Sequence, residues 1–184
     1  VVYLYTKNAI IHHFFCIIDK IQTMKIPSFI VLHHEAPPVI VPGDRFAIVN
    51  QYHKEIFGIV SLLGFYCGYT YFIEKNGKVI QARKDTEPGI HAFQQNMNYR
   101  SIGICMAGNF DLERPAPMQV YALRDLIQRL QKLYNIYDKN IIAHRDVASY
   151  KDCPGKNVDM LWVRTHLSIP KESLWDRITF GLWK

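Results

Sequence analysis

Residues 28–34 read SFIVLHH, a run of apolar and mostly branched side chains that ends in two adjacent histidines. A short apolar run of this kind predicts a buried β-strand over residues 28–33. The following segment, residues 35–43, holds three prolines and a glycine and therefore predicts a loop. His33 and His34 thus stand at the end of a predicted strand, and they are the first candidate site residues.

Helical spacing appears in three segments outside this strand. Asp44 can cap a helix, and apolar residues then recur at intervals of three and four from Phe46 to Ile56. The clearest helix begins at Pro117, a residue suited to the first turn, and the same apolar spacing continues to Tyr134. A final short helix is expected over residues 159–166.

Three other segments predict strands. The pair Asn76 and Gly77 lies between the runs 69–74 and 79–81, and an Asn-Gly pair in that position predicts a β-hairpin. Residues 101–107 read SIGICMA and predict a central strand, and residues 140–143 predict a short strand that ends at His144. Strands and helices therefore alternate. This order predicts an α/β fold, a single domain with a mixed central sheet flanked by helices.

Composition narrows the class of protein. The 184 residues suit one domain, 49% are hydrophobic and 21% charged, and no apolar run approaches the ~18 residues of a membrane-spanning helix. The formal net charge of +6 fits simple solubility or attraction to a polyanion, such as nucleic acid or the anionic bacterial cell wall. The basic residues form no run of five or more, and no aromatic-basic platform is apparent. We therefore expect no nucleic-acid partner.

The four cysteines do not form a disulfide framework. Cys16, Cys67, Cys105 and Cys153 show no CxxC spacing, which excludes a disulfide-stapled small secreted domain. Cys67 and Cys105 lie in apolar runs and are predicted to be buried thiols.

The second candidate region is AHRDVASYKDCPGK, residues 143–156, in which His144 and Cys153 are separated by eight residues. With His33 they make a three-ligand set of the kind that catalytic zinc sites use, in which water takes the fourth position. On spacing alone a second interpretation stays open. The histidine pair would then be a polar strand end, and Cys153 a buried thiol before Pro154.

Four blocks of the chain resemble a known family. They are VLHHEAPP from Val31, GYTYFIEKNGKVIQAR from Gly68, SIGICMAGNFD from Ser101, and AHRDVASYKDCPGK from Ala143. In order and in spacing they resemble the type-2 N-acetylmuramoyl-L-alanine amidases, a family that includes phage amidase-type lysozymes and the peptidoglycan recognition proteins. The resemblance runs from about residue 26 to about residue 167. It implies zinc-dependent hydrolysis of the amide bond between N-acetylmuramic acid and L-alanine in bacterial peptidoglycan.

The resemblance also implies the metal ligands. Position by position, His33, His144 and Cys153 match the residues that bind zinc in this family, which makes Zn²⁺ the expected cofactor. Side chains alternate between the two faces of a strand. Only one histidine of the adjacent pair should therefore face the metal, and His34 should lie on the opposite face. The resemblance implies a zinc site at the sheet edge in a groove.

Three more residues match functional positions of the family. Tyr69 matches the catalytic tyrosine, although a tyrosine at such a place can also be part of the core. Lys151 matches the catalytic lysine, although most loop lysines are simply solvated. His91 resembles a histidine that lines the groove, which makes it a candidate contact to glycan or peptide, and a structural loop histidine is the alternative. Roles cannot be assigned to Asn98, Arg100 and Asn109, which lie in the matched blocks.

Three positions depart from the family pattern. Glu35, Thr70 and Ala82 stand where a threonine, a histidine and a glycine are common. None of the three is an expected ligand, so they bear on substrate preference more than on catalysis.

Two rival functions remain. Some members of the superfamily bind peptidoglycan without cutting it, and these typically lack a metal ligand, often the cysteine. The presence of Cys153 therefore favours an enzyme. A cysteine hydrolase using Cys153 and His144 is the other rival. Cys153 precedes a proline in a loop, where it lacks the helix N-terminus that commonly activates a thiolate.

The expected domain covers residues 24–167, with an N-terminal extension at 1–23 and a tail or packing extension at 168–184. Met24 is a candidate start, and residues 1–23 show no clear signal-peptide pattern. We expect a monomer that acts on the cell wall and stays cytoplasmic until it is released or secreted by an unidentified route. Phage lysin, autolysin and recycling enzyme are all compatible with the sequence.

Overall fold

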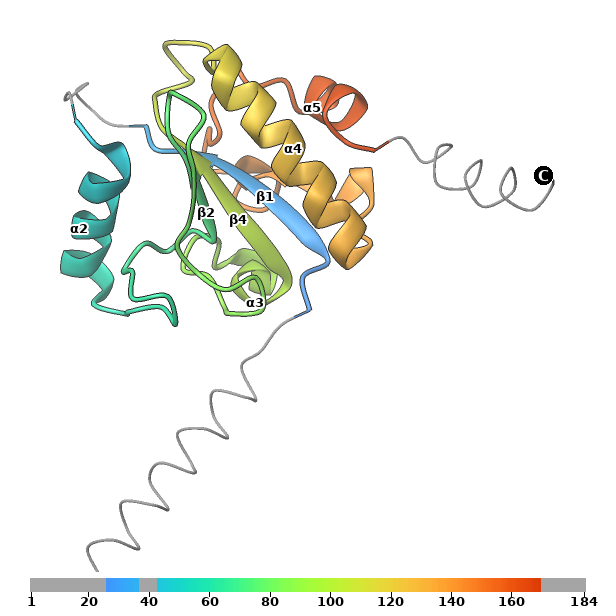
Figure 1. The fold of residues 1–184 in the computed structure, drawn as a ribbon. Coiled ribbons are helices and arrows are strands. Elements are labelled where there is room, and N and C mark those ends of the chain that lie inside the picture. Colours follow the sequence, from blue (N-terminus) through green and yellow to red (C-terminus); the bar gives the residue numbers. More distant parts are fainter. Residues whose placement is uncertain (1–25, 37–42, 170–184) are drawn as a thin grey trace, which may run out of the picture.

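The computed structural model describes residues 26–36 and 43–169 (Figure 1). The expectations for the extension at 1–23, for the tail from residue 170 onward and for most of the proline-rich loop lie outside these ranges. Within them, five strands form one sheet in the order β3-β2-β4-β1-β5. The strands are β1 (Phe29–His34), β2 (Tyr71–Ile73), β3 (Val79–Gln81), β4 (Ser101–Met106) and β5 (Ile141–Ala143).

The sheet is mixed, as the order of predicted elements indicated. Strand β1 runs parallel to both of its neighbours, β4 and β5, and β2 runs parallel to β4. Strands β2 and β3 pair antiparallel as the predicted hairpin. Because β1, β4 and β5 run in the same direction, their carboxyl ends meet at one edge of the sheet. His33 and His34 are the last two residues of β1, and His144 directly follows β5.

The described residues form four α-helices, of which the short one at residues 97–100 was not predicted from the sequence. They are α2 (Arg45–Phe57), α3 (Met97–Arg100), α4 (Pro117–Tyr134) and α5 (Met160–His166). The Asp44 side chain accepts a hydrogen bond from the Ala47 backbone amide at 3.0 Å at the start of α2. Asp159 caps α5 in the same way. The α/β fold with helices on a mixed sheet is therefore confirmed.

Helices cover both faces of the sheet. On one face α4 and α5 pack on a large apolar cluster that includes Ile30 and Leu32 of β1. On the other face α2 packs with Phe72 and Cys105 through Phe46 and Val49. Figure 1 shows α2 on one side of the sheet and α4 and α5 on the other. The sheet thus separates two packing layers.

The second strand is shorter than predicted. Residues 69 and 70 were expected in the strand, but β2 begins at Tyr71. The preceding backbone is held by other segments, because Gly68 N donates to His53 Nδ1 at 2.9 Å. A Cβ at Gly68 would also lie 2.4 Å from the Ile90 carbonyl oxygen. Tyr69 is therefore outside the ladder and follows a turn imposed by its neighbours.

Cys67 and Cys105 are fully buried, as predicted from their apolar surroundings. None of the helices in the described ranges is long and apolar enough to cross a membrane.

The buried face of α4, which packs on the large apolar cluster, contributes to the stability of the protein. Ile127 is fully buried there, so Ile127→Ala is expected to lower the free energy of unfolding by about 2–5 kcal/mol, through lost burial and the cavity left behind. Leu133 of the same helix is 60% exposed. Leu133→Ala should therefore change the free energy of unfolding by less than about 0.5 kcal/mol. Urea denaturation of the two variants tests the difference, and equal losses would contradict this packing.

Candidate metal centre

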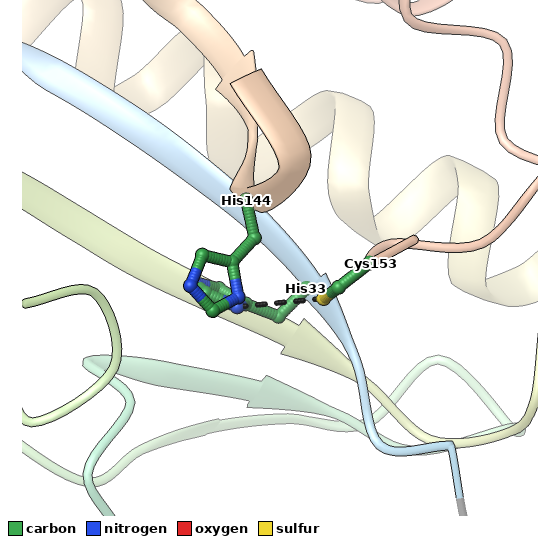
Figure 2. Close-up of side chains that lie close together, drawn as sticks. All are labelled: His33, His144 and Cys153. Atoms are coloured by element: carbon green, nitrogen blue, oxygen red, sulfur yellow. Dashed lines mark hydrogen bonds between the residues drawn. The ribbon is translucent and has the colours of Figure 1, made fainter. Parts of the chain in front are cut away.

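Three segments bring His33, His144 and Cys153 together. His33 is the penultimate residue of β1, His144 is the first residue after β5, and Cys153 lies in the loop that leads to α5. Figure 2 shows the three side chains pointing toward one another. One potential ligand atom from each lies within 4.8 Å of the others. The adjacency of β1 and β5 places both histidines at the same edge of the sheet.

The distances within this group are short. His33 Nδ1 lies 3.6 Å from Cys153 Sγ, and the ring centroids of His33 and His144 are 4.6 Å apart. The loop that carries Cys153 is fastened by Arg145, whose backbone amide donates to the Cys153 carbonyl at 2.9 Å. The Arg145 guanidinium also donates to three backbone carbonyls of this loop, those of Asp152, Gly155 and Val158.

Burial keeps both imidazoles neutral. The pKa of His33 is lowered well below its usual value, first by burial and then by the neighbouring His91 and His144. Burial also lowers the pKa of His144, and the charge of Lys151 lowers it further. A neutral imidazole has a free lone pair on one nitrogen, so both side chains are in the protonation state that binds a metal.

The thiol of Cys153 fits a metal ligand better than a free nucleophile. Burial raises its pKa to about 11, although Lys151 and Arg145 oppose the rise. Without a cation the sulfur is therefore a thiol at neutral pH, whereas a bound metal ion deprotonates a coordinating thiol. Two imidazoles and one sulfur form a donor set that suits zinc. The residues present thus fit the expected metal.

His34 lies on the opposite face of β1, as strand alternation predicted. Its Nδ1 accepts a hydrogen bond from the Phe110 backbone amide at 3.0 Å, and its Nε2 lies 3.9 Å from a carboxylate oxygen of Asp111. These contacts tie β1 to the segment after β4. Within the described residues, the metal-binding group contains His33 and not His34.

Tyr69 packs directly against the candidate ligands. Its ring centroid lies 5.1 Å from that of His33 and 5.5 Å from that of His53 on α2. Burial is the largest cause of a Tyr69 pKa raised well above its usual value, and the nearby Cys105 and Cys153 add to the rise. The hydroxyl is therefore protonated, and it donates a hydrogen bond to the Cys105 thiol.

Lys151 is exposed on the same loop as Cys153. Its backbone amide donates to the Ala148 carbonyl at 2.9 Å, and its Nζ lies 5.4 Å from the centroid of the Tyr150 ring. Its charge lowers the pKa of both His144 and Cys153. The ammonium charge therefore contributes to the electrostatics of two of the three candidate ligands.

His91 lies against His33 and packs on the sheet. Its Nδ1 is 3.0 Å from His33 Nε2, and the two rings meet edge to face with centroids 5.0 Å apart. The sequence did not indicate this contact, since it left His91 as either a candidate contact to glycan or peptide or a structural loop histidine. No spacing rule joins two residues in different segments, so only the three-dimensional arrangement could reveal the pair.

A groove runs beside this group between the end of β1 and α2. It has a volume of about 450 Å³. Tyr69 and His53 line its inner end, and Glu35 and Arg45 form an ion pair in its wall. The remaining lining residues are Ala36, Ile48, Val49 and Tyr52. None of the three candidate ligands is among the described residues that line this groove, and Tyr69, whose ring packs against that of His33, connects the groove to the group.

Comparisons with known proteins agree with this arrangement. Residues 22–156 match the model of a family described as N-acetylmuramoyl-L-alanine amidase. The chain is 29% identical over 138 residues to peptidoglycan-recognition protein SC2 of Drosophila melanogaster, covering 71% of this chain and 70% of that protein. It is 24% identical over 161 residues to an N-acetylmuramoyl-L-alanine amidase of Sus scrofa, covering 80% of this chain and 25% of that protein.

A solved structure extends the likeness to three dimensions. The N-acetylmuramoyl-L-alanine amidase LysC from Clostridium intestinale URNW superposes with a TM-score of 0.63 and 29% sequence identity. The superposition covers 78% of this chain and 86% of that one.

Proposed function

The chain belongs to the N-acetylmuramoyl-L-alanine amidase family, and from this we propose that it is a zinc-dependent amidase. Its substrate in this proposal is the amide bond between N-acetylmuramic acid and L-alanine in bacterial peptidoglycan. The observation that carries the proposal is the convergence of His33, His144 and Cys153, whose ligand atoms lie within 4.8 Å of one another. Two neutral imidazoles and a thiol make a three-ligand set that leaves one coordination position open.

The metal and the chain's own residues have separate tasks. A bound zinc ion polarises a carbonyl and lowers the pKa of water in its open position to about 7. His33, His144 and Cys153 would hold it. The Lys151 ammonium stabilises negative charge that develops on the carbonyl oxygen during attack. The Tyr69 hydroxyl, on a ring that packs against His33, would accept the proton of the attacking water or donate a hydrogen bond at the same centre.

A second candidate is a module that binds peptidoglycan without cutting it. The similarity to a protein named for peptidoglycan recognition supports this alternative. The complete set of three candidate ligands in the described residues favours the amidase. The cysteine hydrolase is disfavoured, because burial raises the pKa of the Cys153 thiol to about 11 and a catalytic cysteine needs a lowered one.

We place the activity at the bacterial cell wall, which the protein would reach by release or secretion. The formal net charge of +6 would favour attraction to an anionic wall, an effect that weakens as salt rises.

Incubation of the purified protein with peptidoglycan tests the proposal. Zinc-loaded protein is expected to release new amino termini of L-alanine. A chelator should remove this activity and added zinc should restore it, because the three side chains alone do not supply a Lewis acid. The new ends are identified by amino-terminal labelling and mass spectrometry of the released peptides.

Two other outcomes would each favour a rival. Zinc-loaded protein that binds peptidoglycan and releases no peptide would indicate the binding module. Release that resists the chelator and is stopped by thiol alkylation would indicate the cysteine hydrolase. Release of new reducing sugar ends in place of amino termini would contradict all three.

A further inference from the structure

The two ring nitrogens of His33 have different surroundings. Nδ1 faces Cys153 Sγ at 3.6 Å, inside the candidate metal group. Nε2 faces His91 Nδ1 at 3.0 Å, on the side of the ring away from the cysteine. His33 is 1% exposed, so water cannot easily replace either contact. Each nitrogen therefore has one partner, and the two partners are chemically distinct.

Metal binding through Nδ1 decides the direction of the contact with His91. A neutral imidazole carries one proton, and the nitrogen that binds a metal must be the other one. If Nδ1 of His33 binds the metal, its proton lies on Nε2. That N–H then donates to His91 Nδ1, which accepts. Histidine ligands of metals commonly donate their second N–H to a fixed acceptor, which sets the tautomer and the orientation of the ring.

The fold holds His91 in the position that this contact needs. The Asn98 side-chain oxygen accepts from the backbone amides of His91 at 2.8 Å and of Ala92 at 2.9 Å. The His91 ring lies over two glycines. A Cβ at Gly103 would be 2.6 Å from the ring and one at Gly89 only 2.3 Å from it. Side chains at either position would displace the imidazole from His33.

We propose that His91 is a positioning residue for the metal centre, which holds His33 in the tautomer and orientation that direct Nδ1 to the metal. The proposal rests on the zinc dependence put forward above. It gives His91 a role toward the candidate ligand His33, and the predicted contact to glycan or peptide stays a separate prediction. It also gives a task to Asn98, which the sequence left without one.

Two substitutions separate the hydrogen bond from the packing. His91→Phe keeps a ring over Gly103 and Gly89 and removes the acceptor, so we expect zinc affinity to fall by about 10- to 100-fold. In His91→Asn the side-chain oxygen can take the place of Nδ1, so most of the affinity should return. Affinity is measured without substrate, by competition with a chromophoric chelator, and circular dichroism checks the fold of each variant.

Either of two results would overturn the proposal. One is a folded His91→Phe protein that binds zinc as tightly as the wild type. The other comes from ¹⁵N-edited NMR of the wild-type chain without metal, which needs no variant to fold. The proposal expects the His33 proton on Nε2, and a proton on Nδ1 would contradict it.

These readouts distinguish failure of this proposal from failure of the proposed function. A wild-type protein that binds zinc and does not cleave peptidoglycan contradicts the amidase and leaves the role of His91 intact. A wild-type protein that cleaves peptidoglycan, with unchanged zinc affinity in His91→Phe, contradicts only the role of His91.

Discussion

Replacing Cys153 by serine is expected to abolish zinc binding and peptidoglycan cleavage together. A neutral hydroxyl is a far weaker zinc ligand than a thiolate, and the remaining His33 and His144 leave the ion with two protein ligands in place of three. The loss of affinity should exceed the ~10- to 100-fold that removing an outer partner of a ligand causes. Chelator competition measures the first effect, and release of L-alanine amino termini measures the second.

A carboxylate at the same position makes the experiment sharper. Aspartate binds zinc, so Cys153→Asp should retain part of the metal affinity that Cys153→Ser loses. A catalytic thiol has no such substitute. Cys67→Ala is the control for the loss of a cysteine as such, because Cys67 is fully buried in the cluster under α2. A Cys153→Ser protein that keeps its zinc and loses only cleavage would point to a nucleophilic cysteine.

The candidate ligands could be predicted because each is marked by local sequence. The apolar run of β1 ends at His33, β5 ends just before His144, and Cys153 lies in the polar loop beyond. Period-two alternation predicted that only one of His33 and His34 faces the metal, and the resemblance identified His33 as that one. The resemblance to a family then joined three local signals into one site, and the structure places their ligand atoms together.

The order of the strands was not predictable in the same way. Strand β4 lies between β1 and the hairpin strand β2, although it follows both in the chain. Strand pairing depends on contacts between distant segments, and periodicity reports only which residues share a face. Tyr69 shows the consequence. It reads as part of a strand, but contacts of Gly68 with His53 and Ile90 hold it outside the ladder.

The same limit applies to His91. The sequence could indicate that this histidine belongs near the groove. It could not show that Gly103, a residue of β4, leaves space for the His91 ring to reach His33. The signal in the sequence is a glycine inside an apolar strand, which suggests a close approach of another group without naming that group.

Replacing Lys151 by alanine is expected to lower kcat by about 10²- to 10³-fold and to leave the metal in place. The magnitude is typical of removing one group that stabilises a developing oxyanion. The charge of Lys151 acts on His144 and Cys153 in two opposing ways. It favours their deprotonated, metal-binding forms, and it repels a cation bound between them. Zinc affinity should therefore change little, and steady-state cleavage with a parallel zinc titration measures both quantities.

Lys156 offers a matched control for Lys151. It is an exposed lysine of the same loop region, and it is not among the causes of the lowered pKa of His144. Lys156→Ala removes the same charge from the protein, so it reports any general loss of attraction to an anionic substrate. If both alanine variants lose activity equally, and if high salt reproduces that loss, then Lys151 acts through long-range attraction. A fall in kcat confined to Lys151→Ala requires instead that its ammonium act at the reacting carbonyl.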